Sequence, residues 1–361
     1  MTSIVHFQER VKAAAASGDS LRIRGGGTKD WYGQALAGAI LDTRSYTGIV
    51  DYEPTELVIT ARCGTPLSEI EAALAERRQM LAFEPPHFGI DATLGGAVAA
   101  ALCGPRRAAG GATRDFVLGT TLLDGRGDLL SFGGRVMKNV AGYDVSRMLA
   151  GSLGTLGLLL DISLKVLPRP VAEATLRFEM GEIDAIRRLN EWGGRPLPIS
   201  ASAWCDGVLA LRLSGAGAAV DAAVRQLGGD SIAHADVFWD SVREQRHPFF
   251  SGAGNVDAPA LWRLSVPSAT GALVLGGVQL IEWGGAQRWL RAGGDAASAA
   301  AIRRTVQACG GHATLFRGGE KDVGVFHPLA PALARINARM KDAFDPARIF
   351  NPGRMFPDRQ D

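Results

Sequence analysis

Four glycine-rich stretches are the part of this sequence whose residue types and spacing could support binding chemistry. They read RGGGTK (24–29), DATLGGA (91–97), GGATRD (110–115) and GSLGTLG (151–157). Because glycine has no Cβ, the backbone N–H groups of such loops can point into a concavity and hold phosphate oxygens. A single loop of this kind also fits an ordinary tight turn. Four of them before residue 160 favour a long ligand that is contacted at many points, and a dinucleotide has that shape.

The spacing of these glycines disfavours two common nucleotide-binding folds. The stretch 151–157 does not have the spacing GxGxxG, and it precedes an expected strand instead of opening a helix. Both features argue against a Rossmann dinucleotide fold. The sequence has no GxxxxGK[ST] motif, which disfavours a P-loop nucleotide hydrolase.

Composition narrows the class of protein further. A chain of 361 residues that is 47% hydrophobic can bury a large core, and its length predicts two or three domains. A net charge of +2 without basic clusters gives no indication of nucleic-acid binding. The four cysteines are far apart and form no CxxC pair, which argues against a zinc site, an iron–sulfur site or a disulfide framework. No apolar run reaches about 18 residues, so we expect no transmembrane segment and a cytoplasmic location.

The elements that must position the glycines can be predicted from alternation and capping. Strands are expected at 21–24, 39–42, 57–61, 117–123 and 158–166, and helices at 3–17 and 65–78, with Thr65 as the cap of the second helix. The segment Leu167–Pro170 breaks this pattern, so a domain boundary is expected at residue 170. Strands and helices then alternate to residue 325, as in an α+β layer, and a helix is expected over 329–344.

The four stretches occur in an order that resembles a known superfamily. RGGGTK, DATLGGAVA, RDFVLGTTLLDGRG and MKNVAGYDVSRMLAGSLGTLGLLLDISLKVLP are similar to the FAD-binding domain of the vanillyl-alcohol oxidase or PCMH-type flavoproteins. The ending FDPARIFNPGRMFP resembles the C-terminal segment of the 2-hydroxyacid dehydrogenase branch. Within that branch, the short length and VMKNVAGYDVSR most resemble the smaller FAD-binding subunits of bacterial glycolate oxidase.

The resemblance implies a fold and a division of the chain. The expected class is α+β, with a PCMH-type FAD-binding domain over 1–170, a smaller α+β cap domain over 171–330 and a C-terminal segment, 331–361, that returns to the FAD domain. The FAD domain would consist of two subdomains, about 1–56 and 57–170.

The resemblance also implies which residues hold the cofactor. The loop that carries the FAD pyrophosphate would be Arg24, Gly25, Gly26, Gly27, Thr28 and Lys29. The remaining cofactor-binding residues would be Thr93, Leu94, Gly95, Gly96, Arg114, Asp115, Gly151, Gly154, Thr155, Gly157 and Ile162. A carboxylate introduced by Gly26→Asp is expected to face the phosphates.

Two departures from the family pattern affect the chemistry. The first glycine loop carries Thr28 and no histidine, so we expect FAD to be bound noncovalently. The HxGDGNxH metal motif of the 2-hydroxyacid dehydrogenases is absent, so no metal is expected. The catalytic candidates that remain are Lys138, Asn139 and Tyr143, from the loop that the family places near the flavin, and His312.

Three functions are compatible with these features. The first is an FAD-binding subunit of a glycolate oxidase, which would oxidise a small 2-hydroxy acid, glycolate, to glyoxylate. Its partners would be a larger FAD-binding subunit and an iron–sulfur subunit, through which the chain could be held peripherally at the inner membrane. The second is a free-standing FAD-dependent dehydrogenase of another small hydroxy acid or alcohol. The third is a non-catalytic scaffold with a degenerate flavin pocket, which the intact glycine loops disfavour.

Overall fold

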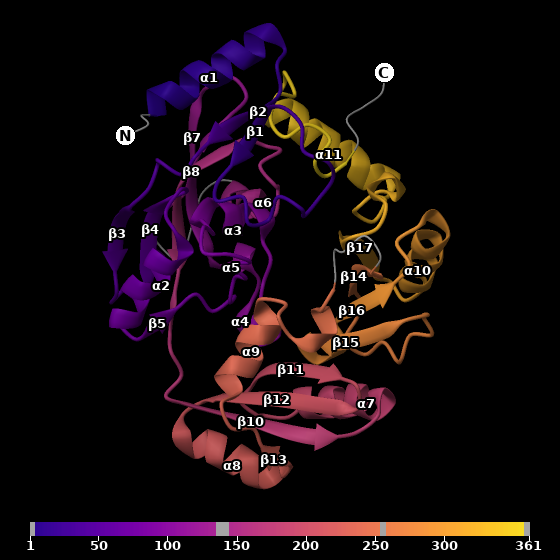
Figure 1. The fold of residues 1–361 in the computed structure, drawn as a ribbon. Coiled ribbons are helices and arrows are strands. Elements are labelled where there is room, and N and C mark those ends of the chain that lie inside the picture. The colour runs from indigo at the N-terminus through magenta and orange to yellow at the C-terminus, as the bar shows by residue number, and fades with distance from the viewer. Residues whose placement is uncertain (1–3, 135–143, 253–257, 357–361) are drawn as a thin grey trace. The chain divides into compact units, whose positions relative to one another are not determined.

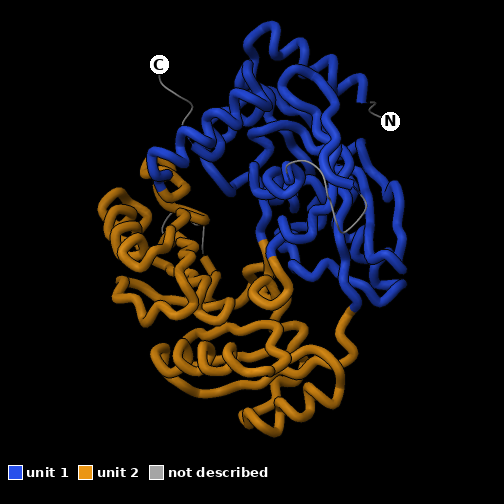
Figure 2. Tube along the Cα trace, turned by 180° about the vertical axis from the view of Figure 1, so that it is seen from behind, with its two compact units in different colours: residues 1–102, 112–168, 328–361 blue, residues 103–111, 169–327 orange. Residues whose placement is uncertain are grey.

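A computed structural model of the chain describes residues 4–134, 144–252 and 258–356. These residues form two compact units, which Figure 2 distinguishes by colour. The first unit contains residues 1–102, 112–168 and 328–361, and the second contains 103–111 and 169–327. The chain passes between the units near residues 168 and 328, close to the boundaries expected at 170 and 330. The assignment of residues 103–111 to the second unit was not expected from the sequence.

The first unit is built on an antiparallel sheet with the strand order β3-β4-β8-β6-β7. Its strands are β3 (Ile49–Glu53), β4 (Val58–Arg62), β6 (Val117–Leu123), β7 (Leu129–Gly133) and β8 (Leu158–Lys165). The central strand β8 is apolar along most of its length and is buried, as expected for a strand that has partners on both edges. Because β3 pairs with β4, the subdomain boundary expected near residue 56 falls inside a hairpin of this sheet.

Two smaller sheets accompany the main sheet. Strands β1 (Leu21–Arg24) and β2 (Ala39–Asp42) are parallel, and β5 (Gln79–Met80) pairs with β9 (Leu167–Pro168). A further parallel bridge joins Leu21 to Phe350, so the end of the chain adds to the free edge of β1. Figure 1 shows this return, with the yellow C-terminal segment beside the indigo strands β1 and β2.

The helices of the first unit cover these sheets. They are α1 (Ile4–Ser17), α2 (Leu67–Glu76), α3 (Leu94–Ala100), α5 (Thr113–Phe116), α6 (Val145–Leu149) and α11 (Pro331–Phe344). Helix α1 buries Phe7, Val11 and Ala14, which lie on one face at spacings of four and three residues.

The second unit contains an antiparallel sheet with the order β13-β10-β12-β11-β15-β16-β14-β17. Its strands are β10 (Ala172–Glu179), β11 (Ile199–Cys205), β12 (Val208–Gly215), β13 (Asp230–Ser231), β14 (Ala260–Ser265), β15 (Val278–Glu282), β16 (Gln287–Ala292) and β17 (His312–Arg317). Its helices are α4 (Arg107–Gly110), α7 (Glu182–Gly193), α8 (Gly217–Leu227), α9 (Ala235–Arg243) and α10 (Ala296–Ala308), with short 3₁₀ turns at Pro248–Phe250, Trp283–Gly285 and Lys321–Val323.

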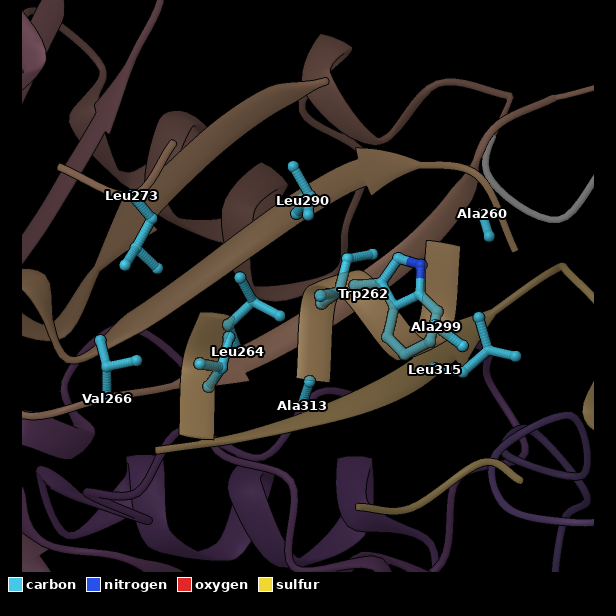
Figure 3. Close-up of a cluster of buried hydrophobic side chains, with 11 residues drawn as sticks. Ala260, Trp262, Leu264, Val266, Leu273, Leu290, Ala299, Ala313 and Leu315 are labelled. Carbon is cyan, nitrogen blue, oxygen red and sulfur yellow. The ribbon is translucent and has the colours of Figure 1, made fainter. Parts of the chain in front are cut away.

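The core of the second unit includes a cluster between strands β14, β16 and β17 and helix α10. Figure 3 shows Trp262 at its centre, beside Ala299 and Leu315. The Trp262 ring is fully buried, and its Nε1 donates a 2.9 Å hydrogen bond to the carbonyl of Gly293. This bond satisfies the one polar atom that the side chain brings into the core.

Several local expectations need correction. Thr65 does not cap α2; its hydroxyl contacts Gly48 instead, and Pro66 holds the N-cap position without a side-chain bond. The second glycine stretch, expected as a turn, opens α3, where the Thr93 hydroxyl accepts from the Gly96 amide. The predicted α+β class is confirmed.

Candidate functional site

A cavity of about 70 Å³ in the first unit brings three of the four glycine stretches together. Its walls include Gly25 of the first stretch, Gly95 and Gly96 of the second, and Gly154 and Gly157 of the fourth. These residues are up to 132 positions apart in the sequence. A cavity of this size admits only a fragment of a dinucleotide, so the rest of such a ligand has to extend beyond it.

The first stretch presents unpaired backbone donors. The amides of Gly25, Gly26, Gly27 and Thr28 donate no hydrogen bond to any of the described residues. Four consecutive amides without a protein acceptor are rare in folded chains, where backbone donors are almost always paired. This arrangement fits a ligand that supplies acceptor oxygens, such as a pyrophosphate.

The glycine at position 26 is required by a close approach between two loops. A Cβ on Gly26 would overlap the carbonyl oxygen of Asp91, which immediately precedes the second stretch. A Cβ on Gly25 would likewise overlap the Thr93 hydroxyl. The expectation that a side chain at position 26 would face the phosphates is therefore wrong, because that side chain would point toward the Asp91 loop.

The basic side chains that flank the first stretch are held by neighbouring residues. Arg24 Nε donates to Asp30 Oδ2 at 2.8 Å, and Arg22 forms an ion pair with the same carboxylate. Lys29 Nζ donates to the carbonyl of His87 at 3.2 Å and to the Thr28 hydroxyl at 3.4 Å. The amides, more than these side chains, are therefore the donors that this loop leaves for a ligand.

The second stretch is held rigidly against its neighbours. Leu94 is buried, and the Gly95 amide donates to the carbonyl of Cys63 at 2.8 Å. A Cβ at position 95 would lie 2.7 Å from the Cys63 Cβ, so the glycine permits this contact. Cys63 also lines the cavity, and burial raises the pKa of its thiol to about 12. At neutral pH the thiol is protonated, which makes it a poor nucleophile.

The third stretch does not line this cavity. The Arg114 side chain is 67% exposed, and Asp115 accepts from the Ala112 amide at 2.8 Å as part of the start of α5. Gly110 and Gly111 belong to the second unit. The structure thus assigns Asp115 a local capping bond, and the cofactor role of Arg114 and Asp115 stays a prediction.

The fourth stretch divides its residues between two cavities. Gly154 and Gly157 line the small cavity, whereas Gly151 and Thr155 line a second one of about 560 Å³ beside α11. The Thr155 hydroxyl donates to the carbonyl of Ser152 at 2.7 Å. Ile162 is fully buried in β8 and lines neither cavity.

Sequence reasoning missed the residues of the C-terminal segment that reach both cavities. Asn351 lines both of them, and Lys341 and Arg354 line the larger one. All three residues are buried, at 7%, 8% and 6% exposure. The signal available in the sequence was the motif FNPG, which indicated that the tail returns to the first unit without indicating what it contacts.

The catalytic candidates receive no support from the described residues. Lys138, Asn139 and Tyr143 lie outside them. His312 begins β17 in the second unit, where it is opposite Ser265. Partial desolvation, together with Arg263 and His327, lowers its pKa, so His312 is neutral at pH 7. Within the described ranges, no group of three or more His, Cys, Asp or Glu residues could hold a metal ion.

No helix among the described residues is both long enough and apolar enough to span a bilayer.

Comparison of the sequence with known proteins shows the family of this chain. Residues 1–133 match the family described as "FAD binding domain". The chain is 49% identical over 348 residues to the glycolate oxidase subunit GlcE of Escherichia coli (strain K12), which covers 96% of both proteins. It is also 30% identical over 148 residues to the glycolate oxidase subunit GlcD of Bacillus subtilis (strain 168), covering 41% of this chain and 31% of that protein.

Further similarities are more distant. A D-lactate dehydrogenase of Anaerostipes hadrus is 32% identical over 140 residues, which cover 38% of this chain and 29% of the dehydrogenase. The solved structure of an alkyldihydroxyacetonephosphate synthase superposes with a TM-score of 0.64 at 14% identity, covering 96% of this chain and 75% of the synthase. At that identity the likeness concerns the fold, which supports the expected PCMH-type architecture. The chain is an FAD-binding protein, and it belongs to the family of the glycolate oxidase subunit GlcE.

Proposed function

We propose that this chain is an FAD-binding subunit of a glycolate oxidase and contributes to the oxidation of glycolate to glyoxylate. The observation that carries this proposal is the 49% identity over 96% of the chain to a subunit of that enzyme. The amides of the first glycine stretch also support it. They have no acceptor among the described residues, and they lie in the loop where the family would hold the FAD pyrophosphate.

FAD, when bound, would supply a redox group that takes up and releases electrons. The contribution of this chain's residues is to bind and orient the cofactor. The amides of Gly25, Gly26, Gly27 and Thr28 would donate to pyrophosphate oxygens, and Gly95, Gly96, Gly154 and Gly157 would form the walls that let the chain approach it closely. The first glycine stretch carries Thr28 and no histidine, which supports noncovalent binding.

We further propose that the chain works in a complex with a larger FAD-binding subunit and an iron–sulfur subunit. The sequence around His312 and His327 lacks the HxGDGNxH motif, so activation of the substrate hydroxyl is assigned to the larger subunit. The glycine stretches of this chain would hold an FAD that serves as an electron relay from the larger subunit to the iron–sulfur partner, and the partners would bring the chain to the inner membrane.

Reconstitution from separately purified components tests this function. The chain, the larger subunit and the iron–sulfur subunit are mixed in all combinations, and glycolate-dependent reduction of an artificial electron acceptor is measured. We expect activity to require this chain together with its partners. Anaerobic bleaching of the flavin by glycolate in this chain alone would contradict the assigned relay role and support a free-standing dehydrogenase. Acid precipitation should release all flavin into the supernatant, and flavin retained in the pellet would contradict noncovalent binding.

A further inference from the structure

The C-terminal segment forms the outer edge of the strand that leads into the first glycine stretch. The Leu21 amide donates to the carbonyl of Ile349 at 2.7 Å, and the Asn351 amide donates to the carbonyl of Leu21 at 2.8 Å. These bonds continue the parallel pairing of β1. At Asn351 the backbone turns away with a φ of +39°, so it offers no carbonyl to the next amide of the strand.

Beyond this turn, the side chain of Asn351 supplies the acceptor that the backbone does not. Its Oδ1 accepts from the Ile23 amide at 2.8 Å, and its Nδ2 donates to the carbonyl of Leu153 at 2.6 Å. Leu153 belongs to the fourth glycine stretch, so one buried amide group links that stretch to the strand before the first. A Cβ at Gly154 would lie 2.8 Å from this Nδ2, which explains why the neighbouring position is glycine.

The next donor in this series faces the ligand site. Because N–H groups alternate along an extended strand, the amides of residues 21, 23 and 25 point to the same edge. The first is paired with the backbone of Ile349 and the second with the side chain of Asn351. Gly25 lines the small cavity together with Asn351, and its amide has no acceptor among the described residues.

We propose that Asn351 is a positioning residue for the cofactor: it fixes the first glycine stretch relative to the fourth, so that the Gly25 amide points at a phosphate oxygen of FAD. This inference rests on the proposed assignment of these stretches to FAD. Asparagine suits the position because one short side chain supplies both an acceptor and a donor. Neither role requires contact between Asn351 and the cofactor.

The substitution Asn351→Asp tests this inference with little change in shape. It keeps an acceptor for the Ile23 amide but directs a second carboxylate oxygen at the carbonyl of Leu153, where the donor was. Asn351→Ser removes both bonds without adding charge. Ser163→Ala is the matched control, because it removes a buried 2.8 Å hydrogen bond to Thr60 in the main sheet of the same unit, away from the glycine stretches.

The readout is the Kd for FAD, obtained by titrating the full-length apoprotein and following the change in flavin fluorescence. We expect Kd to rise at least tenfold for both Asn351 variants and to stay within twofold of wild type for Ser163→Ala. The unfolding midpoint of each apoprotein is measured by circular dichroism. If the Asn351 variants and the control have similar midpoints, a larger rise in Kd for the Asn351 variants is not explained by lost stability. Wild-type Kd in the two folded Asn351 variants would overturn the inference.

A measurement on the wild-type chain applies even if both variants fail to fold. Saturating FAD should slow hydrogen exchange of the Ile23 amide at least fivefold, because binding holds together the two loops that Asn351 joins. Unchanged exchange at Ile23 would overturn the inference. If the wild-type chain binds FAD but shows no activity with its partners, the proposed function fails while the role of Asn351 stands.

Discussion

The buried ion pair between Lys341 and Asp345 offers the sharpest test of how the C-terminal segment is held. Lys341 Nζ donates to the carbonyls of Thr155 and Phe350, both at 2.8 Å, and to Asp345 Oδ2 at 2.6 Å. The two side chains are 10% and 0% exposed. Asp345 also accepts from the amides of Ile349 and Phe350. Lys341→Met removes the cation and leaves the buried carboxylate with these two amides alone.

The expected cost follows from this geometry. Removing one partner of a buried ion pair typically destabilises a protein by about 3–5 kcal/mol, because the remaining charge is desolvated without compensation. We therefore expect Lys341→Met to lower the free energy of unfolding by about 3 kcal/mol or more. Combining it with Asp345→Asn removes the stranded charge, so the double variant should lose less than the sum of the two single losses, by at least about 1.5 kcal/mol.

Urea unfolding followed by circular dichroism measures these free energies. Lys12→Met, on the exposed side of α1, controls for the loss of a lysine charge and should change the stability by less than about 0.5 kcal/mol. If the two units unfold in separate transitions, only the transition of the first unit should move. A loss below about 1 kcal/mol for Lys341→Met, or additive single losses, would refute the reasoning.

Three further predictions concern other parts of the molecule. Cys63 should resist alkylation by iodoacetamide at pH 8 until the chain unfolds, since burial raises its pKa to about 12; rapid labelling of the folded chain would contradict this. Glu173→Gln should lower the urea midpoint at pH 7, and the difference should shrink as the pH falls below about 4.5. Burial alone would raise the pKa of the Glu173 carboxyl, but hydrogen bonds from Ser214 and Arg106 outweigh it and lower this pKa in the folded state, so the contribution to stability is lost on protonation. A difference that is constant with pH would exclude this linkage. Leu290→Ala should cost about 2–5 kcal/mol in calorimetry, because Leu290 is fully buried in the cluster of Figure 3; a loss below 1 kcal/mol would show that the cluster collapses around the smaller side chain.

Local sequence signals were sufficient for many of the elements. The strands at 21–24, 39–42 and 117–123 were predicted with the bounds that the structure has, because alternation and nearby turn residues define a strand locally. Helix α3 was missed, because Gly95 and Gly96 have low helix propensity. In the structure, the Thr93 cap and the burial of Leu94 and Val98 favour the helix over that propensity.

The candidate site was predictable only where its residues form a motif. All four glycine stretches were expected to meet around one ligand, and the small cavity brings three of them together. The contacts of Asn351 with Ile23 and of Lys341 with Thr155 were not predictable, because these partners lie 328 and 186 residues away and a single asparagine or lysine carries no periodic signal. The third stretch does not line this cavity. Asp115 accepts a local capping bond from the Ala112 amide, and its predicted role in cofactor binding stays a prediction.

The limits of the matched FAD binding domain have a consequence for how the site forms. The match ends at residue 133, whereas Gly154, Gly157 and Asn351 also line the cavity. A chain that ends after residue 344 would keep every glycine of the four stretches, but it would lack the side chain that joins the first to the fourth. Because the loop between Ile23 and Asn351 contains most of the chain, closing it costs conformational entropy that only the nearly complete fold can offset. If Asn351 positions the first stretch as proposed, high affinity for the cofactor requires the segment that carries this residue, and we predict that the cofactor binds only after that segment has paired with β1.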